Sequence, residues 1–202
     1  MLPPILCISN MEWDAPLPTN RQQLMRRFAE RTEVAVVEAP LPVLGSVAGR
    51  SRGRRRNLGW RRDGNVQVLH AWDAIPYPLA RRSPALSRAA DAAFRGYVAA
   101  RWRELRRAAP ILWLYTSDGG NLLGAVRERA TIYHCVDDHD ALEPYNRYRR
   151  TAVYDPCKRE DFLVKAADLV IVTSPRLSQR WSAVNPHTHL LPNVADTALF
   201  AA

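Results

Sequence analysis

A cluster of acidic residues with one histidine follows an apolar run in the second half of the chain. Asp137, Asp138, His139 and Asp140 come directly after Thr131–Val136, a run typical of a buried strand. Neighbouring carboxylates suit a general base, and paired acids can also bind Mg²⁺ or accept a phosphoryl group. The alternative is a solvated turn that caps a helix.

The loop after the first expected strand, Pro4–Ser9, offers a second polar group. Asn10, Trp13 and Asp14 combine an aromatic face with an amide and a carboxylate, a mixture that suits sugars. The loop has no glycine, so it lacks the GxGxxG turn that brings backbone close to a dinucleotide's pyrophosphate. We therefore expect no dinucleotide cofactor there. The alternative for Trp13 is ordinary loop packing.

A third candidate, Asp118, stands at the start of the expected helix Gly119–Arg129, just after the expected strand Ile111–Thr116. The free N–H groups of a helix start favour an anion or a sugar hydroxyl. The alternative is that Asp118 only caps the helix.

These polar groups need a scaffold, and the chain indicates one in which short apolar runs alternate with helical stretches. The runs are continuous rather than alternating, as in parallel strands covered on both faces. The expected strands are Pro4–Ser9, Glu33–Ala39, Val66–Ala71, Ile111–Thr116, Thr131–Val136, Leu169–Thr173 and His189–Leu191. The expected helices are Arg21–Arg31 capped by Asn20, Pro84–Ala109, Gly119–Arg129, Pro156–Ala166 and Pro175–Trp181. This order predicts an α/β fold with a doubly wound, mostly parallel, Rossmann-like sheet.

Composition places the chain among soluble globular proteins, with 202 residues of which 47% are hydrophobic. No run approaches the roughly 20 apolar residues of a membrane span, and the start lacks the basic region of a signal peptide. Cys7, Cys135 and Cys157 are scattered, which argues against a disulfide framework or a zinc site and for a reducing compartment. We expect a cytoplasmic chain without a metal, with Cys7 and Cys135 buried.

The net charge of +9 is concentrated in one segment. Arginine occupies seven of thirteen positions there: Arg50, Arg52, Arg54, Arg55, Arg56, Arg61 and Arg62. We predict that Arg52, Arg54, Arg55 and Arg56 contact phosphates or an anionic membrane face. The alternative is a solvated loop without a partner. Aromatic residues are not interleaved with the basic ones, so we expect no nucleic-acid partner.

Several segments together resemble a known family. They are Trp13-Asp14, Arg21-Gln22 with Phe28–Arg31, Val34–Pro40, Leu112–Tyr115, Tyr133–Asp138, Ala167–Ser174 and Leu191–Phe200. In this order the sequence resembles the N-terminal half of GT-B glycosyltransferases, of the family 4 type found in bacterial envelope polysaccharide synthesis. The resemblance covers most of the chain except the arginine-rich insertion. Val194 departs from the pattern, because family members commonly have Gly after the Pro-Asn pair.

The resemblance implies transfer of a sugar from a nucleotide-sugar co-substrate to a saccharide or lipid-linked acceptor, without another cofactor. It implies that residues 1–192 form the acceptor-binding domain, with an arginine-rich loop at 45–64, and that 193–202 begin a linker. The donor-binding domain would be absent, so the chain alone would be inactive unless a separate domain or chain supplied it. The enzyme would work in the cytoplasm, peripherally at the inner membrane face.

The resemblance also assigns roles within the site. Asp137 or Asp138 would be the catalytic or acceptor-orienting carboxylate. The acceptor side of the cleft would be lined by Trp13, Asp14, Asp118 and His139, with Asn10 beside them as a substrate-binding residue. A different class of function also fits the sequence, namely a non-catalytic module that binds a saccharide or a partner chain as a truncated paralogue.

Overall fold

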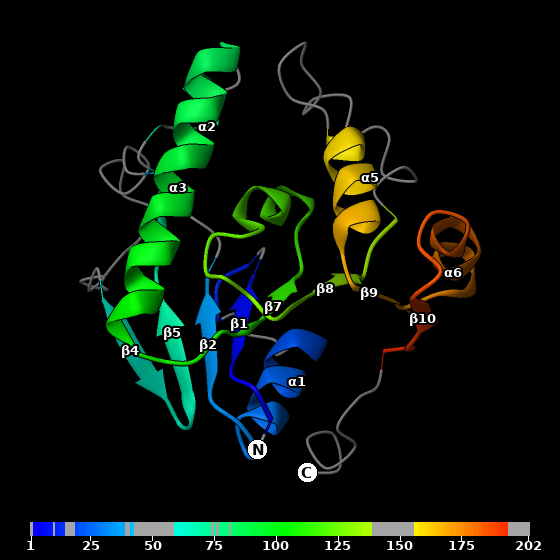
Figure 1. Cartoon of the computed structure of the whole chain (residues 1–202), viewed down its shortest axis with the longest axis horizontal. Helices are drawn as coiled ribbons and strands as arrows, with labels where there is room; N and C mark the ends of the chain where they lie inside the picture. Colours follow the sequence, from blue (N-terminus) through cyan, green and yellow to red (C-terminus); the bar gives the residue numbers. More distant parts are fainter. Residues whose placement is uncertain are drawn as a thin grey trace.

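The chain folds around one large, mostly parallel β-sheet, seen in Figure 1. The computed structural model describes residues 2–9, 11–14, 19–38, 41–42, 59–73, 75, 77–80, 82–138 and 156–193. The sheet has eight strands in the order β10-β9-β8-β7-β1-β2-β5-β4, and only β4 is antiparallel to its neighbour. The strands are β1 Ile5–Ile8, β2 Val34–Val37, β4 Trp60–Asp63, β5 Val66–Leu69, β7 Ile111–Leu114, β8 Ala130–Cys135, β9 Leu169–Val172 and β10 Thr188–Leu190. A separate parallel pair joins β3 Leu41–Pro42 to β6 Trp72–Asp73.

The helices are divided unequally between the two faces of the sheet. They are α1 Asn20–Phe28, α2 Tyr77–Ala80, α3 Pro84–Glu104, α5 Pro156–Ala166, α6 Pro175–Ser182 and the 3-10 helix η1 Ser117–Leu122. Residues of α3, η1, α5 and α6 share one hydrophobic core with the sheet, whereas α1 and the loop after β1 share the other. Figure 1 shows η1 between α3 and α5.

Strand β1 shows how the sequence supports both cores. Leu6 and Ile8 belong to the core under α3 and α5, whereas Ile5 and Cys7 belong to the core under α1. All four side chains are at most 3% exposed. Cys135 is buried as well. The prediction of a doubly wound α/β sheet covered on both faces is therefore confirmed, as is the burial of both cysteines.

Two predicted helix starts are wrong. Helix α1 is preceded by Thr19 as its N-cap rather than capped by Asn20, and the Thr19 N–H donates to Gln22 Oε1 at 2.9 Å. The segment predicted as the helix Gly119–Arg129 is the short 3-10 helix η1 instead. Its N-cap is Thr116, whose hydroxyl oxygen accepts from the Asp118 N–H at 3.3 Å, so Asp118 is not the cap.

The ends of helices α1 and α3 also differ from the predictions. Helix α1 ends at Phe28 rather than at residue 31, and α3 ends at Glu104 rather than at residue 109, with Arg106 at a φ of 50° just beyond. The insertion predicted to be irregular over 45–64 ends in strand β4, which turns into β5 at Gly64 with a φ of 56°. Residues 45–58 lie outside the described part of the chain. Within that part, no helix is both long and apolar enough to cross a membrane.

Candidate functional site

The direction of strand succession reverses between β1 and β7. From β1 the chain proceeds through β2 to β5 on one side, and from β7 through β8 and β9 to β10 on the other. In open α/β sheets, ligands bind beyond the carboxyl ends of the strands at such a reversal. The residues that leave these ends are therefore the first candidates for function.

The loop after β1 is held by Glu38, the residue that follows β2. The Trp13 backbone N–H donates to Glu38 Oε1 at 2.5 Å, and Gln22 of α1 donates to the Trp13 carbonyl at 3.2 Å. Trp13 itself is only 2% exposed, and its indole N–H donates to Asp63 at 2.6 Å. The Trp13 ring is thus packed into the core beneath α1 rather than offered to solvent, as the packing alternative stated.

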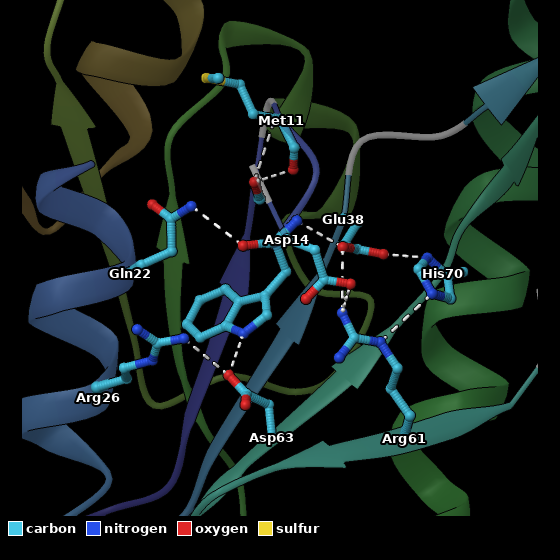
Figure 2. Close-up of polar contacts among 10 residues, drawn as sticks. Met11, Asp14, Gln22, Arg26, Glu38, Arg61, Asp63 and His70 are labelled. Carbon is cyan, nitrogen blue, oxygen red and sulfur yellow. Dashed lines mark hydrogen bonds and ion pairs between the residues drawn. The ribbon is translucent and has the colours of Figure 1, made fainter. Parts of the chain in front are cut away.

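Glu38 is the centre of a polar network at this edge, shown in Figure 2 and called the Glu38 network below. Its second oxygen faces Nδ1 of His70, the residue after β5, and Arg61 Nη2 lies 3.6 Å from Oε1. Arg61 Nε also donates to His70 Nε2 at 3.4 Å, so the neutral imidazole donates through Nδ1. The Glu38 side chain is 2% exposed. Burial raises the pKa of the Glu38 carboxyl, while the hydrogen bond from Trp13 and the charge of Arg61 act in the opposite direction.

Two further carboxylates border the network. Asp14 accepts from Arg61 Nη2 at 3.0 Å. Asp63 accepts from Arg26 at 3.0 Å as well as from the Trp13 indole at 2.6 Å, and Figure 2 shows Asp63 beside Arg26. The hydrogen bond from Trp13, followed by that from Arg26, lowers the pKa of Asp63. The predicted sugar-binding residues Trp13 and Asp14 therefore already have partners within the fold.

Asp137 and Asp138 follow β8, as predicted, but their surroundings differ. Asp138 is paired with Arg176 Nε at 2.9 Å and with Arg180 Nη1 at 3.4 Å, both from α6, and its side chain is 16% exposed. Asp137 is exposed, and its side chain forms no ion pair with the described residues. Asp138 thus joins the loop after β8 to α6, and Asp137 is the carboxylate of the two that a ligand can reach.

Asp118, at the start of η1, borders a hollow between α3, η1 and α5. Arg159 of α5 bridges Asp118, at 3.3 Å, and Asp91 of α3, at 3.0 Å. Asn121 and Phe162 also line this hollow, whose volume is about 420 Å³. Asp118 is therefore part of an ion-paired rim.

The predicted site residues follow three neighbouring strands of the sheet. Asp14 lies in the loop after β1, Asp118 follows β7, and Asp137 and Asp138 follow β8. Asn10, His139 and Arg52, Arg54, Arg55 and Arg56 lie outside the described residues. Within the described part of the chain, no three residues among His, Cys, Asp and Glu form a group that could hold a metal ion.

Solved structures of two synthases have a fold similar to that of this chain. The chain is similar to the alpha,alpha-trehalose-phosphate synthase (UDP-forming) from Burkholderia vietnamiensis, with a TM-score of 0.51 and 14% identity over 90% of this chain. It is also similar to the alpha,alpha-trehalose 6-phosphate synthase from Burkholderia multivorans, with a TM-score of 0.53 and 12% identity over 91% of this chain. The likeness to these two synthases is one of fold. The chain spans 43% of the length of each synthase. No protein-family model matches the sequence, and no curated protein matches it by sequence.

The arrangement at the carboxyl edge combines a fixed scaffold with a few open polar groups. The Glu38 network holds the loop after β1, and the Tyr97 hydroxyl of α3 donates to the His70 carbonyl at 3.0 Å. The open polar groups are the Asp137 carboxylate and the side chains that line the hollow beside Asp118, and most of them carry oxygen atoms. Such groups accept hydrogen bonds from hydroxyls, and a carboxylate among them can also accept a proton.

Sequence reasoning missed the residues at the centre of these contacts. Glu38 was visible as a lone carboxylate directly after the apolar strand Val34–Val37, a position that often signals a buried, paired group. His70 after Val66–Leu69 gave the same signal. Arg159 gave none, because its partners are contributed by α3 and η1, far away in the sequence.

Proposed function

We propose that this chain is the acceptor-side domain of a GT-B glycosyltransferase, which moves a sugar from a nucleotide-sugar donor to a saccharide or lipid-linked acceptor. The main support is the doubly wound sheet, in which the direction of strand succession reverses between β1 and β7. About nine tenths of the chain is similar in fold to the two Burkholderia trehalose-phosphate synthases. The sequence resemblance supports the finer assignment to the family 4 type of envelope polysaccharide synthesis. The donor-binding half would lie outside these 202 residues.

Within this domain, Asp137 is the residue we assign to the acceptor. Its exposed carboxylate, beside the reversal of the sheet, would accept a hydrogen bond from the acceptor hydroxyl and orient its oxygen toward the donor's anomeric carbon. A new bond then joins that oxygen to the sugar, the bond from the sugar to the diphosphate breaks with its electron pair staying on the diphosphate oxygen, and the hydroxyl proton passes to the Asp137 carboxylate. Asp138, held by two arginines, would position the loop that carries Asp137.

The arginines at 52, 54, 55 and 56 support a place for the enzyme at an anionic membrane face on the cytoplasmic side. Each arginine near such a surface contributes about 1 kcal/mol of attraction. This part of the proposal depends on composition alone. Sedimentation with vesicles that contain anionic lipid, compared with neutral vesicles, tests it directly.

The enzymatic proposal is tested with the whole product of the reading frame that encodes this chain. The product is incubated with UDP- and GDP-sugars and a panel of saccharide acceptors, and release of nucleoside diphosphate is measured. We expect acceptor-dependent release that falls at least tenfold in Asp137→Asn. We also expect no release from residues 1–202 alone, so robust turnover by that segment would contradict the separate donor-binding half. If the whole product binds a saccharide without any release, the protein is a non-catalytic binding module.

A further inference from the structure

The hollow between α3, η1 and α5 carries polar groups that the Glu38 network does not use. Asp91, Asp118, Asn121, Arg159 and Phe162 line it, and its volume of about 420 Å³ falls within the range of small-molecule sites, roughly 300–1,000 Å³. Figure 1 shows the elements that form its walls, α3 and α5 with η1 between them.

The polar rim of the hollow is held in place before any ligand arrives. Arg159 Nη2 lies 3.0 Å from Asp91 Oδ2, and Arg159 Nη1 lies 3.3 Å from Asp118 Oδ1. The three side chains are 26–38% exposed, so they are paired and still reachable from solvent. A rim whose rotamers are fixed by its own ion pairs loses little conformational entropy when a ligand binds.

Asn121 adds an acceptor that lacks a donor. Its Nδ2 donates to Asp91 Oδ1 at 3.3 Å, which fixes the orientation of the amide. Its Oδ1 is buried and has no hydrogen-bond partner in the described part of the chain. Arg95 holds the backbone around it by donating to the carbonyls of Asn121 and Leu123 at 2.8 and 2.6 Å. A buried unpaired acceptor is destabilising, and because this oxygen has no accessible surface, a ligand hydroxyl can donate to it only after a small shift of the amide or of the wall of the hollow.

Phe162 gives the hollow an apolar wall. Its side chain is 58% exposed although it is a large aromatic residue, and it lies against η1, where a Cβ on Gly120 would come within 3.4 Å of its ring. A partly exposed ring beside hydroxyl-binding groups can pack against the C–H face of a sugar ring while the hydroxyls bond to the rim.

We propose that this hollow binds an uncharged saccharide. Its described lining holds two carboxylates and one guanidinium, so the charge of a phosphate or carboxylate on the ligand would be repelled, whereas neutral hydroxyls find both acceptors and a donor. Binding here does not depend on the proposed function, because a non-catalytic saccharide-binding protein would need it equally. Only the naming of the saccharide as the acceptor depends on that function.

Saturation-transfer NMR on the whole chain tests this proposal. The probes are D-glucose, D-mannose, D-galactose and N-acetyl-D-glucosamine, with D-glucose 6-phosphate as the charged comparison. We expect saturable binding of at least one neutral sugar in the millimolar range, about −4 kcal/mol, and weaker binding of the phosphate. Phe162→Ala and Asp91→Asn should each weaken it at least tenfold, while Asp161→Asn, an exposed neighbour outside the hollow, should not change it.

Three results would overturn the proposal: no saturable binding of any neutral sugar, binding unchanged in Phe162→Ala and Asp91→Asn, or tighter binding of glucose 6-phosphate. Folding of each variant is checked by its urea midpoint, and Phe162 and Asp91 are partly exposed, so both variants are expected to fold. Sugar binding without transfer supports this site while it counts against the proposed function. Undiminished transfer in Phe162→Ala, with sugar binding lost, would show that the saccharide bound in the hollow is not the acceptor.

Discussion

The Glu38 carboxylate accepts a hydrogen bond at 2.5 Å from the backbone N–H of Trp13, a residue 25 positions earlier in the chain. The Trp13 carbonyl is satisfied by Gln22 in turn, so both backbone polar groups of this loop residue are bonded to side chains of other elements. The position of Trp13 in the loop after β1 is therefore imposed by tertiary contacts at the end of β2 and on α1. Trp13 is thus held in place near the edge of the sheet where ligands bind.

Replacement of Glu38 by alanine should destabilise the fold. The Trp13 N–H, His70 and Arg61 would lose their shared acceptor in a buried place, so we expect the free energy of unfolding to fall by about 2–4 kcal/mol. Urea denaturation at pH 7 measures this change. Glu30→Ala is the matched control, because Glu30 is exposed and should change stability by less than about 0.5 kcal/mol. Equal effects of the two substitutions would show that Glu38 does not anchor the loop.

Glu38→Gln tests the titration of the same carboxyl. Burial raises its pKa in the folded protein above the usual 4.5, so the folded state takes up this proton more readily than the unfolded state. The stability associated with this group is present below pH 4.5 and is lost as the pH rises through the higher folded pKa. Relative to Glu38→Gln, the wild type should therefore become less stable from pH 4.5 toward neutrality. Parallel pH profiles of unfolding for the two proteins would contradict the raised pKa.

His134 should make the protein sensitive to acid. Its ring is 3% exposed, stacks on Tyr115 with ring centroids 4.8 Å apart, and has no hydrogen bond at either nitrogen among the described residues. Burial lowers the pKa of His134 from 6.5 to about 4. As the pH falls, the His134 imidazole therefore takes up a proton in the unfolded chain before it does so in the folded protein. The stability contributed by neutral His134 is fully present above pH 6.5 and is lost as the pH falls toward 4. At about 1.4 kcal/mol per pKa unit the loss is about 3 kcal/mol.

Substitution His134→Phe keeps an aromatic ring and removes the titration, so this part of the acid sensitivity should disappear. Urea midpoints between pH 7 and 4.5 measure it. His189→Gln is the control, because His189 is exposed, and it should follow the wild-type profile. An acid loss in His134→Phe as large as that of the wild type would rule out His134 as its source.

The two aspartates after β8 should have separable effects. Asp138→Asn breaks the pairs with Arg176 and Arg180, so it should lower the free energy of unfolding by about 1 kcal/mol, and less at high salt. Asp137→Asn should leave stability within about 0.5 kcal/mol but should lower acceptor-dependent transfer by the whole gene product at least tenfold. Urea denaturation and a transfer assay on both variants measure the two effects. Loss of stability in Asp137→Asn, or full transfer by it, would reverse the assignment.

The sheet could be predicted because each strand is a short apolar run, a signal that depends only on local sequence. Strand β4 could not, because Trp60-Arg-Arg-Asp63 is polar and is a strand only through its pairing with β5. The N-cap of α1 was predicted wrongly for a similar reason. Thr19 and Asn20 are both good N-cap residues, and the hydrogen bond from the Thr19 N–H to the Gln22 side chain selects Thr19. The candidate site residues were predicted to follow strands, and Asp137 and Asp138 do follow β8, while their role in a site stays a prediction. The pairing of Asp138 with α6, and of Asp118 with Arg159, depends on contacts between distant elements that periodicity does not reveal.

Asn185 should be among the most sensitive buried polar positions of the described fold. Its Nδ2 donates to the carbonyls of Val164 and Ala167 at the end of α5, both at 2.8 Å, and its Oδ1 accepts from the His187 N–H at 2.9 Å. The side chain is 4% exposed, so water cannot replace these bonds. Asn185→Ala should lower the free energy of unfolding by about 2–4 kcal/mol, measured in urea, because buried groups lose their partners.

The aspartate variant at this position distinguishes the donor from simple packing. Asn185→Asp keeps the shape of the side chain and the acceptor for His187, but it turns a carboxylate oxygen toward two carbonyl oxygens. The carboxylate would repel the two carbonyl oxygens to which the Asn185 amide donates. Asn185→Asp should therefore be at least as destabilising as Asn185→Ala at pH 7. Ser182→Ala, at an exposed position on α6, is the control and should change little. An aspartate variant more stable than the alanine variant would show that side-chain volume, rather than the two donated bonds, holds α5 to the segment before β10.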